Sequence, residues 1–283
     1  MKLIFIIILI LLILFFIYIL RYNNNNNIIH PCDYFIHGTN NFNNKFEHSE
    51  KMLRSIGAKD ELIIKLKNIR EKLGKNIVYA IKNKDNNYRI EIYLYSKNIT
   101  ETNYNNVDKS KFKKDINIIL NEFNKEYDGN LDDAVLVSFD LELTDSSFNN
   151  KLHIYEAKVG ASSNYNYTYD LDKKTSELES NFFRIMNYDE LNKKLVNKEK
   201  FIKELKEISP NPTNMMFHHK YHNNSIGIYL MENDNNILER FLDRYNYKIA
   251  FEKESSKDLI FDIGINYDLN EDKIISTGFF DYF

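Results

Sequence analysis

The sequence predicts an α+β fold in which an N-terminal transmembrane helix precedes four helix-plus-β-hairpin units. The strands of these units would form an antiparallel sheet or barrel with helices on one face. Two observations predict this fold. An uncharged apolar run occupies residues 3–20. Beyond residue 47, a stretch with helical spacing of apolar residues is followed by two stretches of alternating apolar and polar residues, and this order occurs four times.

The apolar run from Leu3 to Leu20 is expected to anchor the chain in a membrane, within a transmembrane segment at residues 1–21. Its eighteen residues, at 1.5 Å rise each, would cross most of a ~30 Å hydrocarbon core. A cleaved secretory signal is the alternative, but "YILRYNN" offers no small-residue cleavage site. Lys2 and the α-amino group, set against Arg21, favour a single-pass signal anchor with the C-terminal domain on the translocated side.

An asparagine-rich linker is predicted at residues 22–46, ahead of an αββ-repeat domain at 47–283. The linker contains five consecutive asparagines and no apolar periodicity. His30, Cys32 and His37 lie in it, but three ligands without a fourth lack the spacing of a zinc site, so we expect no metal there. Cys32 is the only cysteine, which excludes an intrachain disulfide.

Composition removes several functional classes. The net charge is −3, and the 38 basic and 41 acidic residues are interspersed, so nucleic acid is not an expected partner. The chain has 8 glycines and contains no glycine-rich phosphate loop, serine nucleophile elbow or HExxH motif. The common hydrolase and nucleotide-binding classes are therefore not expected, and no cofactor is predicted.

Four helices are expected from the spacing of apolar residues, at 60–73, 108–127, 176–208 and 234–245. Gly74 follows the first helix at the position where glycine often ends a helix. Asp108 is placed to cap the start of the second helix and Gly129 to end it. Ser176 and Glu179 have the spacing of a capping box, which predicts the start of the third helix.

Each helix is followed by a predicted hairpin. The strand pairs are expected at 76–83 and 88–96, 134–143 and 151–157, 214–222 and 225–231, and 258–269 and 273–283. The first and third hairpins match in Tyr79 against Phe217, Lys82 against Lys220 and "IEIYL" against "IGIYL". A duplication of residues 60–160 into 175–283 would explain this match. The alternative is that strands rich in isoleucine and tyrosine look alike by composition.

The strands have one apolar and one polar face, because successive side chains point to opposite sides. In "VLVSFDLEL" the valines, Phe139 and two leucines share one face, while Ser138, Asp140 and Glu142 share the other. The apolar faces are expected under the helices. If the sheet closes into a barrel, the polar face encloses an interior that can hold a small ligand. If the sheet stays open, the polar face meets water, and this is the arrangement we favour.

The repeated helix-plus-hairpin order, with tyrosines on second strands, resembles the aromatic prenyltransferases of the αββα-barrel type over most of residues 60–283. In that family a Lys or Arg two residues before the tyrosine holds the prenyl diphosphate, and the tyrosines shield the allylic cation. Here the corresponding pairs are Glu91 and Tyr93, His153 and Tyr155, and Gly227 and Tyr229. A carboxylate at Glu91 would repel a diphosphate, so the diphosphate cage is missing.

Two functional hypotheses remain. The first is a membrane-anchored interaction or structural component with an open sheet or a filled interior and no ligand, whose protein partner the sequence does not identify. Its anchor and composition resemble uncharacterised membrane proteins of AT-rich giant viruses of amoebae, which implies a host or virion membrane. The second is a membrane-tethered small-ligand binder or prenyltransferase-like enzyme with a cavity of ~300–1,000 Å³.

The second hypothesis assigns residues to roles. If the protein is an enzyme, Glu91 or Asp140 would be the base. The expected ligand-binding residues are Tyr93, His153, Tyr155, Tyr229 and Asp262. A cluster at His218, Lys220 and His222 is not expected to bind metal, because on a strand the lysine ammonium would repel a cation.

Overall fold

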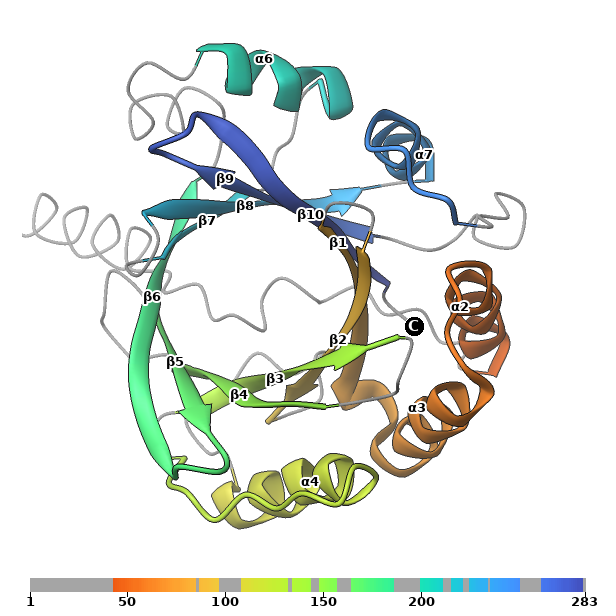
Figure 1. Ribbon diagram of the computed structural model, residues 1–283, viewed down its shortest axis with the longest axis vertical. Coiled ribbons are helices and arrows are strands. Elements are labelled where there is room, and N and C mark those ends of the chain that lie inside the picture. The colour runs from red at the N-terminus through yellow and green to blue at the C-terminus, as the bar shows by residue number, and fades with distance from the viewer. Residues whose placement is uncertain are drawn as a thin grey trace, which may run out of the picture.

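The barrel is built from ten antiparallel strands with five described α-helices outside it (Figure 1). This computed structural model describes residues 43–84, 87–96, 108–131, 134–143, 148–156, 164–185, 199–210, 215–220, 224–233, 235–249 and 261–281. The strands are β1 (Ile77–Lys84), β2 (Asn87–Tyr95), β3 (Ala134–Glu142), β4 (Phe148–Glu156), β5 (Asn164–Asp170), β6 (Thr175–Ile185), β7 (Met215–Lys220), β8 (Ser225–Asn233), β9 (Phe261–Asp268) and β10 (Lys273–Asp281). The helices are α2 (Asn43–Ser55), α3 (Asp60–Leu73), α4 (Lys109–Asn121), α6 (Glu199–Ile208) and α7 (Asn235–Arg244).

Each strand pairs with its neighbours along the chain, and β1 pairs with β10 to close the barrel. The open sheet that we favoured from the sequence is therefore wrong. Closure follows from strand number and twist, because a twisted antiparallel sheet of ten strands can curl until its two edges pair. In the closing pair, Ala80 lies opposite Phe280 and Lys82 lies opposite Gly278.

The predicted helix at 176–208 is mostly wrong. Residues 164–185 form the β5–β6 hairpin, and among the described residues of this region only Glu199–Ile208 are helical, as α6. The Ser176 and Glu179 pair is part of strand β6 and does not cap a helix. Leu171 to Lys174 form the hairpin turn, and the carboxylate of Asp170, the last residue of β5, accepts hydrogen bonds from the backbone N–H groups of Asp172 and Lys173.

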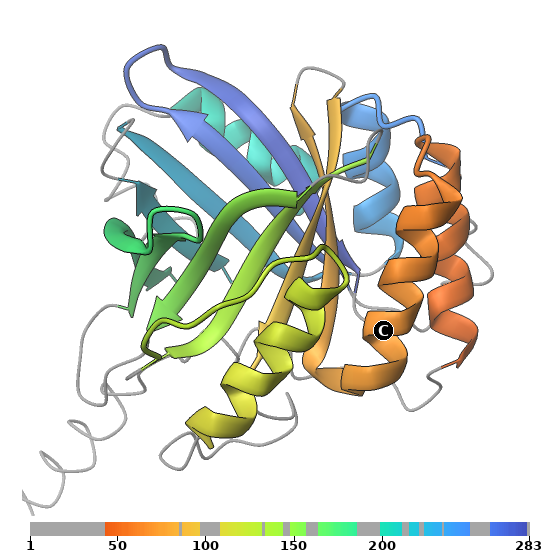
Figure 2. The same cartoon turned by 60° about the horizontal axis from the view of Figure 1, so that its bottom comes forward.

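The outer face of the barrel wall forms the apolar core beneath the helices, as predicted. On β2, Ile90, Ile92 and Leu94 are fully buried, and on α3 the facing Leu62 and Leu66 are fully buried too. Figure 2 shows α2 and α3 lying side by side against this part of the wall. Burying these side chains stabilises the fold by ~1.5–3 kcal/mol each. The opposite faces of the same strands therefore point into the barrel.

Helix ends follow the predicted signals at Gly74 and Asp108 but not at Gly129. Helix α3 spans the predicted residues and ends at Gly74, whose positive φ of 61° is one that residues other than glycine rarely adopt. Asp108 caps α4 by accepting a hydrogen bond from the backbone N–H of Lys111. Helix α4 ends at Asn121, well before Gly129, because Asn124 has a positive φ of 57° and the Lys125 N–H bonds back to the Leu120 carbonyl. Beyond it, the side chain of Asn117 bonds both backbone groups of Tyr127.

The predicted anchor at residues 3–20 lies outside the described residues, as does the zinc-ligand trio of the linker. None of the helices that the structure describes is long and apolar enough to cross a membrane. Helix α2 begins at Asn43, so the last residues of the predicted linker are helical. Strand β5 lies between the two halves of the proposed duplication and strand β6 lies at the start of the second half. The duplication itself stays a prediction.

Candidate functional site

Polar side chains from seven strands meet inside the barrel and form what we call the lumenal cluster. Its members are Lys82, Glu91, Tyr93, Ser138, Asp140, His153, Tyr155, Asn166, Thr168, Glu179 and Tyr229. Strand register explains their meeting: Tyr93, Ser138, His153 and Thr168 lie directly opposite one another in a row across β2 to β5. Each belongs to the strand face opposite the apolar one, so alternation aims all of them inward.

The charged members of the cluster form a chain of alternating sign. The Lys82 Nζ lies 2.5 Å from the Glu91 carboxylate and 3.9 Å from the Asp140 carboxylate. The His153 Nε2 lies 3.9 Å from Asp140, and its Nδ1 lies 2.8 Å from Glu179. The order is therefore carboxylate, ammonium, carboxylate, imidazole, carboxylate. Alternation keeps like charges apart, which matters because Glu91 and Asp140 are directly opposite on adjacent strands.

Hydroxyl groups surround the Glu91 end of the chain. The Tyr93 hydroxyl donates a hydrogen bond to Glu91. The Ser138 hydroxyl lies 3.4 Å from Glu91 and 3.4 Å from the Tyr155 hydroxyl. The rings of Tyr93 and Tyr155 are 6.4 Å apart at an angle of 40°. Glu91 is 3% exposed, so this carboxyl is removed from water and held by protein groups.

The Glu179 end is held by donors from the neighbouring strands. The Thr168 hydroxyl donates to Glu179 at 2.7 Å, and the Asn166 side-chain amide donates at 3.0 Å. Together with His153, they give one carboxylate oxygen three partners. These contacts depend on the β5–β6 hairpin, which supplies Asn166, Thr168 and Glu179.

Two buried acceptor atoms in the cluster have no hydrogen-bond donor among the described residues: the Oδ1 of Asp140 and the Oδ1 of Asn166. The Lys82 ammonium is an ion-pair neighbour of Asp140 Oδ1 but is too distant for a hydrogen bond. Asn166 is 1% exposed, so bulk water does not replace the missing donor. A buried acceptor without a donor costs about 1–3 kcal/mol. Among the described side chains, the cluster therefore has fewer hydrogen-bond donors than its buried acceptors need.

The cluster shifts the pKa of its members in directions that follow from burial and neighbours. Burial raises the pKa of Glu91, although Lys82 opposes this. Burial also opposes ionisation of Asp140, but the charges of Lys82 and His153 outweigh it and hold its pKa below the usual range. For His153, burial favours the neutral ring, but Asp140 and Glu179 raise the pKa to about 10. At neutral pH the imidazole is therefore a cation.

The tyrosines of the cluster stay protonated. Burial raises the pKa of Tyr93, Tyr155 and Tyr229, and the charge of Glu91 raises all three further. Tyr229 is on β8, across the barrel from β2 and β4, and its hydroxyl is close enough to Lys82 and Glu91 for their charges to act on it. Three aromatic rings therefore flank the Glu91 end of the charge chain.

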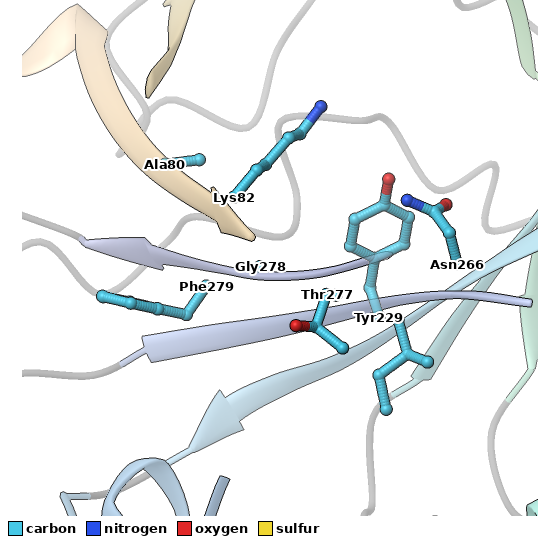
Figure 3. A pocket seen from close by; sticks show the side chains of 9 residues that line it. Ala80, Lys82, Tyr229, Asn266, Thr277, Gly278 and Phe279 are labelled. Carbon is cyan, nitrogen blue, oxygen red and sulfur yellow. The ribbon is translucent and has the colours of Figure 1, made fainter. Parts of the chain in front are cut away.

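A cavity adjoins the cluster between Lys82 and Tyr229, as Figure 3 shows. In the strand register Lys82 lies opposite Gly278, Gly278 opposite Gly264, and Gly264 opposite Tyr229. Only two glycines therefore separate Lys82 from Tyr229 along the wall, and their lack of side chains leaves space between these two residues. A Cβ on Gly278 would lie 3.2 Å from the Lys82 Cγ. The cavity has a volume of about 10 Å³, room for about one water molecule. This cavity is far smaller than the one predicted for a ligand binder.

The structure brings together six of the seven site residues predicted from the sequence: Glu91, Tyr93, Asp140, His153, Tyr155 and Tyr229. Asp262 lies on β9 opposite Phe280, and its side chain is outside the described part of the chain. Sequence reasoning missed Lys82, Asn166, Thr168 and Glu179. Strict alternation in "NYNYTYD" is the signal that could have found two of them.

Within the described ranges, no group of three or more His, Cys, Asp or Glu side chains is arranged to hold a metal ion. The sequence matches no model of a known protein family, and a search of curated proteins finds no match. Function must therefore be inferred from the chemistry of the lumenal cluster.

Proposed function

We propose that this protein is a small-ligand-binding barrel whose lumenal cluster contacts the ligand. The observation that carries the proposal is the alternating chain of five charged side chains inside a closed barrel. The apolar pattern of residues 3–20 supports a further part of the proposal, that the barrel is tethered to a membrane.

Stability alone does not account for such a cluster. Replacing a buried ion-pair network by well-packed apolar residues is often neutral or stabilising by 1–4 kcal/mol. Other inward positions of the same wall are occupied by small or apolar residues, such as Val78, Ala80 and Gly264. Buried groups with shifted pKa values gather preferentially at functional sites. These considerations favour a ligand site over a purely structural interior.

Closure also changes the balance between the two hypotheses drawn from the sequence. A polar face on an open sheet requires no ligand, because water satisfies it. The same face inside a barrel is shielded from bulk water, as Ser138 at 0% and Glu91 at 3% exposure illustrate. We therefore prefer ligand binding to the interaction or structural role.

Enzymatic transfer to an aromatic acceptor is a second candidate, favoured by the arrangement around Glu91. Its raised pKa and its contact with the Tyr93 hydroxyl suit a general base. Tyr93, Tyr155 and Tyr229 would then shield a cationic intermediate, as in the prenyltransferases that the sequence resembles. The charge of Lys82 acts on Tyr229, but Glu91 and Asp140 already neutralise this lysine. Diphosphate binding therefore has weaker support than ligand binding.

The test is a thermal-shift screen of the full chain in detergent micelles against small aromatic amines, phenols and phosphorylated compounds. We expect at least one class to raise the Tm of the wild type and to lose this effect in Glu91→Gln. Glu142→Gln is the matched control, because Glu142 pairs with Arg89 at 3.0 Å outside the lumenal cluster and is 38% exposed at its side chain. The proposal is wrong if no compound shifts the Tm, or if every shift survives in Glu91→Gln.

A further inference from the structure

We infer that the lumenal site takes a small neutral compound with hydroxyl groups on two adjacent carbons, that is, a vicinal diol. The ligand class rests on the proposed function, because it names what that site would bind. The observation that leads to it is the geometry around Asp140, whose two carboxylate oxygens each face a nitrogen donor across a gap.

Each gap is too wide for a direct hydrogen bond but narrow enough for a hydroxyl group to bridge. The Asp140 Oδ1 lies 3.9 Å from the Lys82 Nζ, and its Oδ2 lies 3.9 Å from the His153 Nε2. Hydrogen bonds between such atoms are about 2.8 Å long, so one oxygen atom can bond to both sides of either gap. The Oδ1 is moreover a buried acceptor that has no hydrogen-bond donor among the described residues.

A hydroxyl group suits both sides of such a gap, because it can donate one hydrogen bond and accept another. It would donate to the Asp140 carboxylate and accept from the nitrogen. An ammonium group only donates, so it would face Lys82 and His153 with N–H groups of its own. A carboxylate ligand only accepts, so it would leave Asp140 without a donor. Because the diol is neutral, its binding does not depend on the net charge of the barrel interior.

The two gaps share one carboxylate, and this sets the spacing of the hydroxyl groups. Hydroxyls on adjacent carbons are close enough together to reach both oxygens of a carboxylate, whereas hydroxyls on opposite sides of a ring are not. The two donors are held from behind, because Lys82 Nζ lies 2.5 Å from Glu91 and His153 Nδ1 lies 2.8 Å from Glu179. Burial opposes protonation of His153, but Asp140 and Glu179 raise its pKa to about 10, so its Nε2 carries a proton at neutral pH.

The carbon skeleton of the diol would lie in the cavity between Lys82 and Tyr229, beside Gly264 and Gly278 (Figure 3). This cavity of about 10 Å³ has room for about one water molecule, so a neighbour must move to admit a larger compound. The Lys82 side chain is 32% exposed, whereas that of Glu91 is 4% exposed. The flexible stem of Lys82 can therefore bend toward solvent while its ammonium stays near the site.

The experiment uses calorimetry at pH 7 to measure binding of cis-cyclohexane-1,2-diol, cis-cyclohexane-1,4-diol, cyclohexylammonium and cyclohexanecarboxylate. The full chain is kept in micelles of an amine-oxide detergent and in a buffer without hydroxyl groups, so that neither competes. The 1,2-diol should bind at least tenfold more tightly than its 1,4 isomer and than either charged compound. Asp140→Asn and His153→Gln should each weaken 1,2-diol binding roughly tenfold or more, since each removes hydrogen bonds to a charged group. Glu142→Gln, on the same strand as Asp140, should leave binding unchanged.

The comparison of the two isomers needs no variant, so it remains decisive if Asp140→Asn does not fold. Equal affinity for the two isomers, or tighter binding of a charged compound, would overturn the diol class and leave the proposed function standing. A preference for the 1,2-diol that survives in Asp140→Asn would overturn the site. Absence of binding by all four probes would also overturn the diol class, and together with a negative thermal-shift screen it would overturn the proposed function.

Discussion

Removing the Lys82 ammonium tests the lumenal charge chain most directly. The Nζ lies 2.5 Å from Glu91, whose side chain is 4% exposed, and 3.9 Å from Asp140. Lys82→Met keeps the apolar stem and removes the charge. It leaves two carboxylates directly opposite each other on β2 and β3 without their shared cation. Breaking a buried ion pair in this way costs about 3–5 kcal/mol.

Two features place the expected cost at the low end, near 3 kcal/mol. The Lys82 side chain is 32% exposed, so part of its charge already interacts with water. Burial raises the pKa of Glu91, and loss of Lys82 raises it further, so this carboxyl can take up a proton. Because folding raises the pKa of Glu91, its protonated form stabilises the fold. This contribution is fully present below the pKa of an unfolded glutamate, near 4.3, and is lost as pH rises through the folded-state pKa. The cost of Lys82→Met should therefore shrink as pH falls.

The assay is urea unfolding of the full chain in detergent micelles, followed by tyrosine fluorescence because the chain has no tryptophan. Lys125→Met is the matched control: its side chain is 33% exposed, close to the 32% of Lys82, but its partner Asp172 is 59% exposed. Such an exposed pair should contribute less than about 1 kcal/mol. The double variant Lys82→Met, Glu91→Gln should recover at least half of the loss. A cost under about 1 kcal/mol for Lys82→Met, or additive costs in the double variant, would refute the charge chain.

Two further predictions concern His153 and Gly278. Burial opposes protonation of His153, but Asp140 and Glu179 raise its pKa to about 10 from 6.5, so its contribution is fully present below pH 6.5 and lost as pH rises through 10. This contribution is at most about 5 kcal/mol. The difference in unfolding free energy between wild type and His153→Gln should shrink between about pH 6 and pH 10. A constant difference would contradict a protonated His153 in the folded protein. Gly278→Ala would place a Cβ 3.2 Å from the Ile81 carbonyl and the Lys82 Cγ. It should cost about 1–2 kcal/mol in urea unfolding, and a variant as stable as wild type would show that the wall relaxes freely.

Local periodicity was enough to predict eight of the ten strands and helices α3, α4 and α7, but not strands β5 and β6 or helix α2. Helix α3 has the predicted bounds, and Asp108 caps α4 as expected. The reason is that Ile90, Ile92 and Leu94 repeat with the period of a strand, while Leu62 and Leu66 repeat with that of a helix. These are the positions where local preference and burial agree, so a single sequence is informative there.

The β5–β6 hairpin was missed because its outer face carries tyrosines on β5 and the exposed Leu178 on β6, where the other strands carry buried aliphatic side chains. Leu178 on β6 is 38% exposed, in contrast to the fully buried leucines of β2 and α3. A repeated signal was nevertheless present. "YDLDKK" at 169–174 parallels "YDLNED" at 267–272, and in both turns the aspartate accepts hydrogen bonds from the backbone N–H groups two and three residues on. The final residues, Lys174 and Asp272, both have positive φ.

The missed hairpin explains why the site was only half predicted. The alternation of side chains along the strands was enough to predict that Glu91, Asp140 and His153 share one polar face. With only these charges the face is acidic, which favoured the prediction that it is exposed to solvent. The remaining cation, Lys82, and the remaining carboxylate, Glu179, depend on pairing between strands. Lys82 points into the barrel only when β1 is paired with both β2 and β10. Glu179 does so only when residues 175–185 form a strand. Charge alternation across five strands is thus a property of the closed barrel. If Lys82→Met and His153→Gln prove energetically coupled, as their common neighbours Asp140 and Glu91 predict, the lumenal cluster responds as one network.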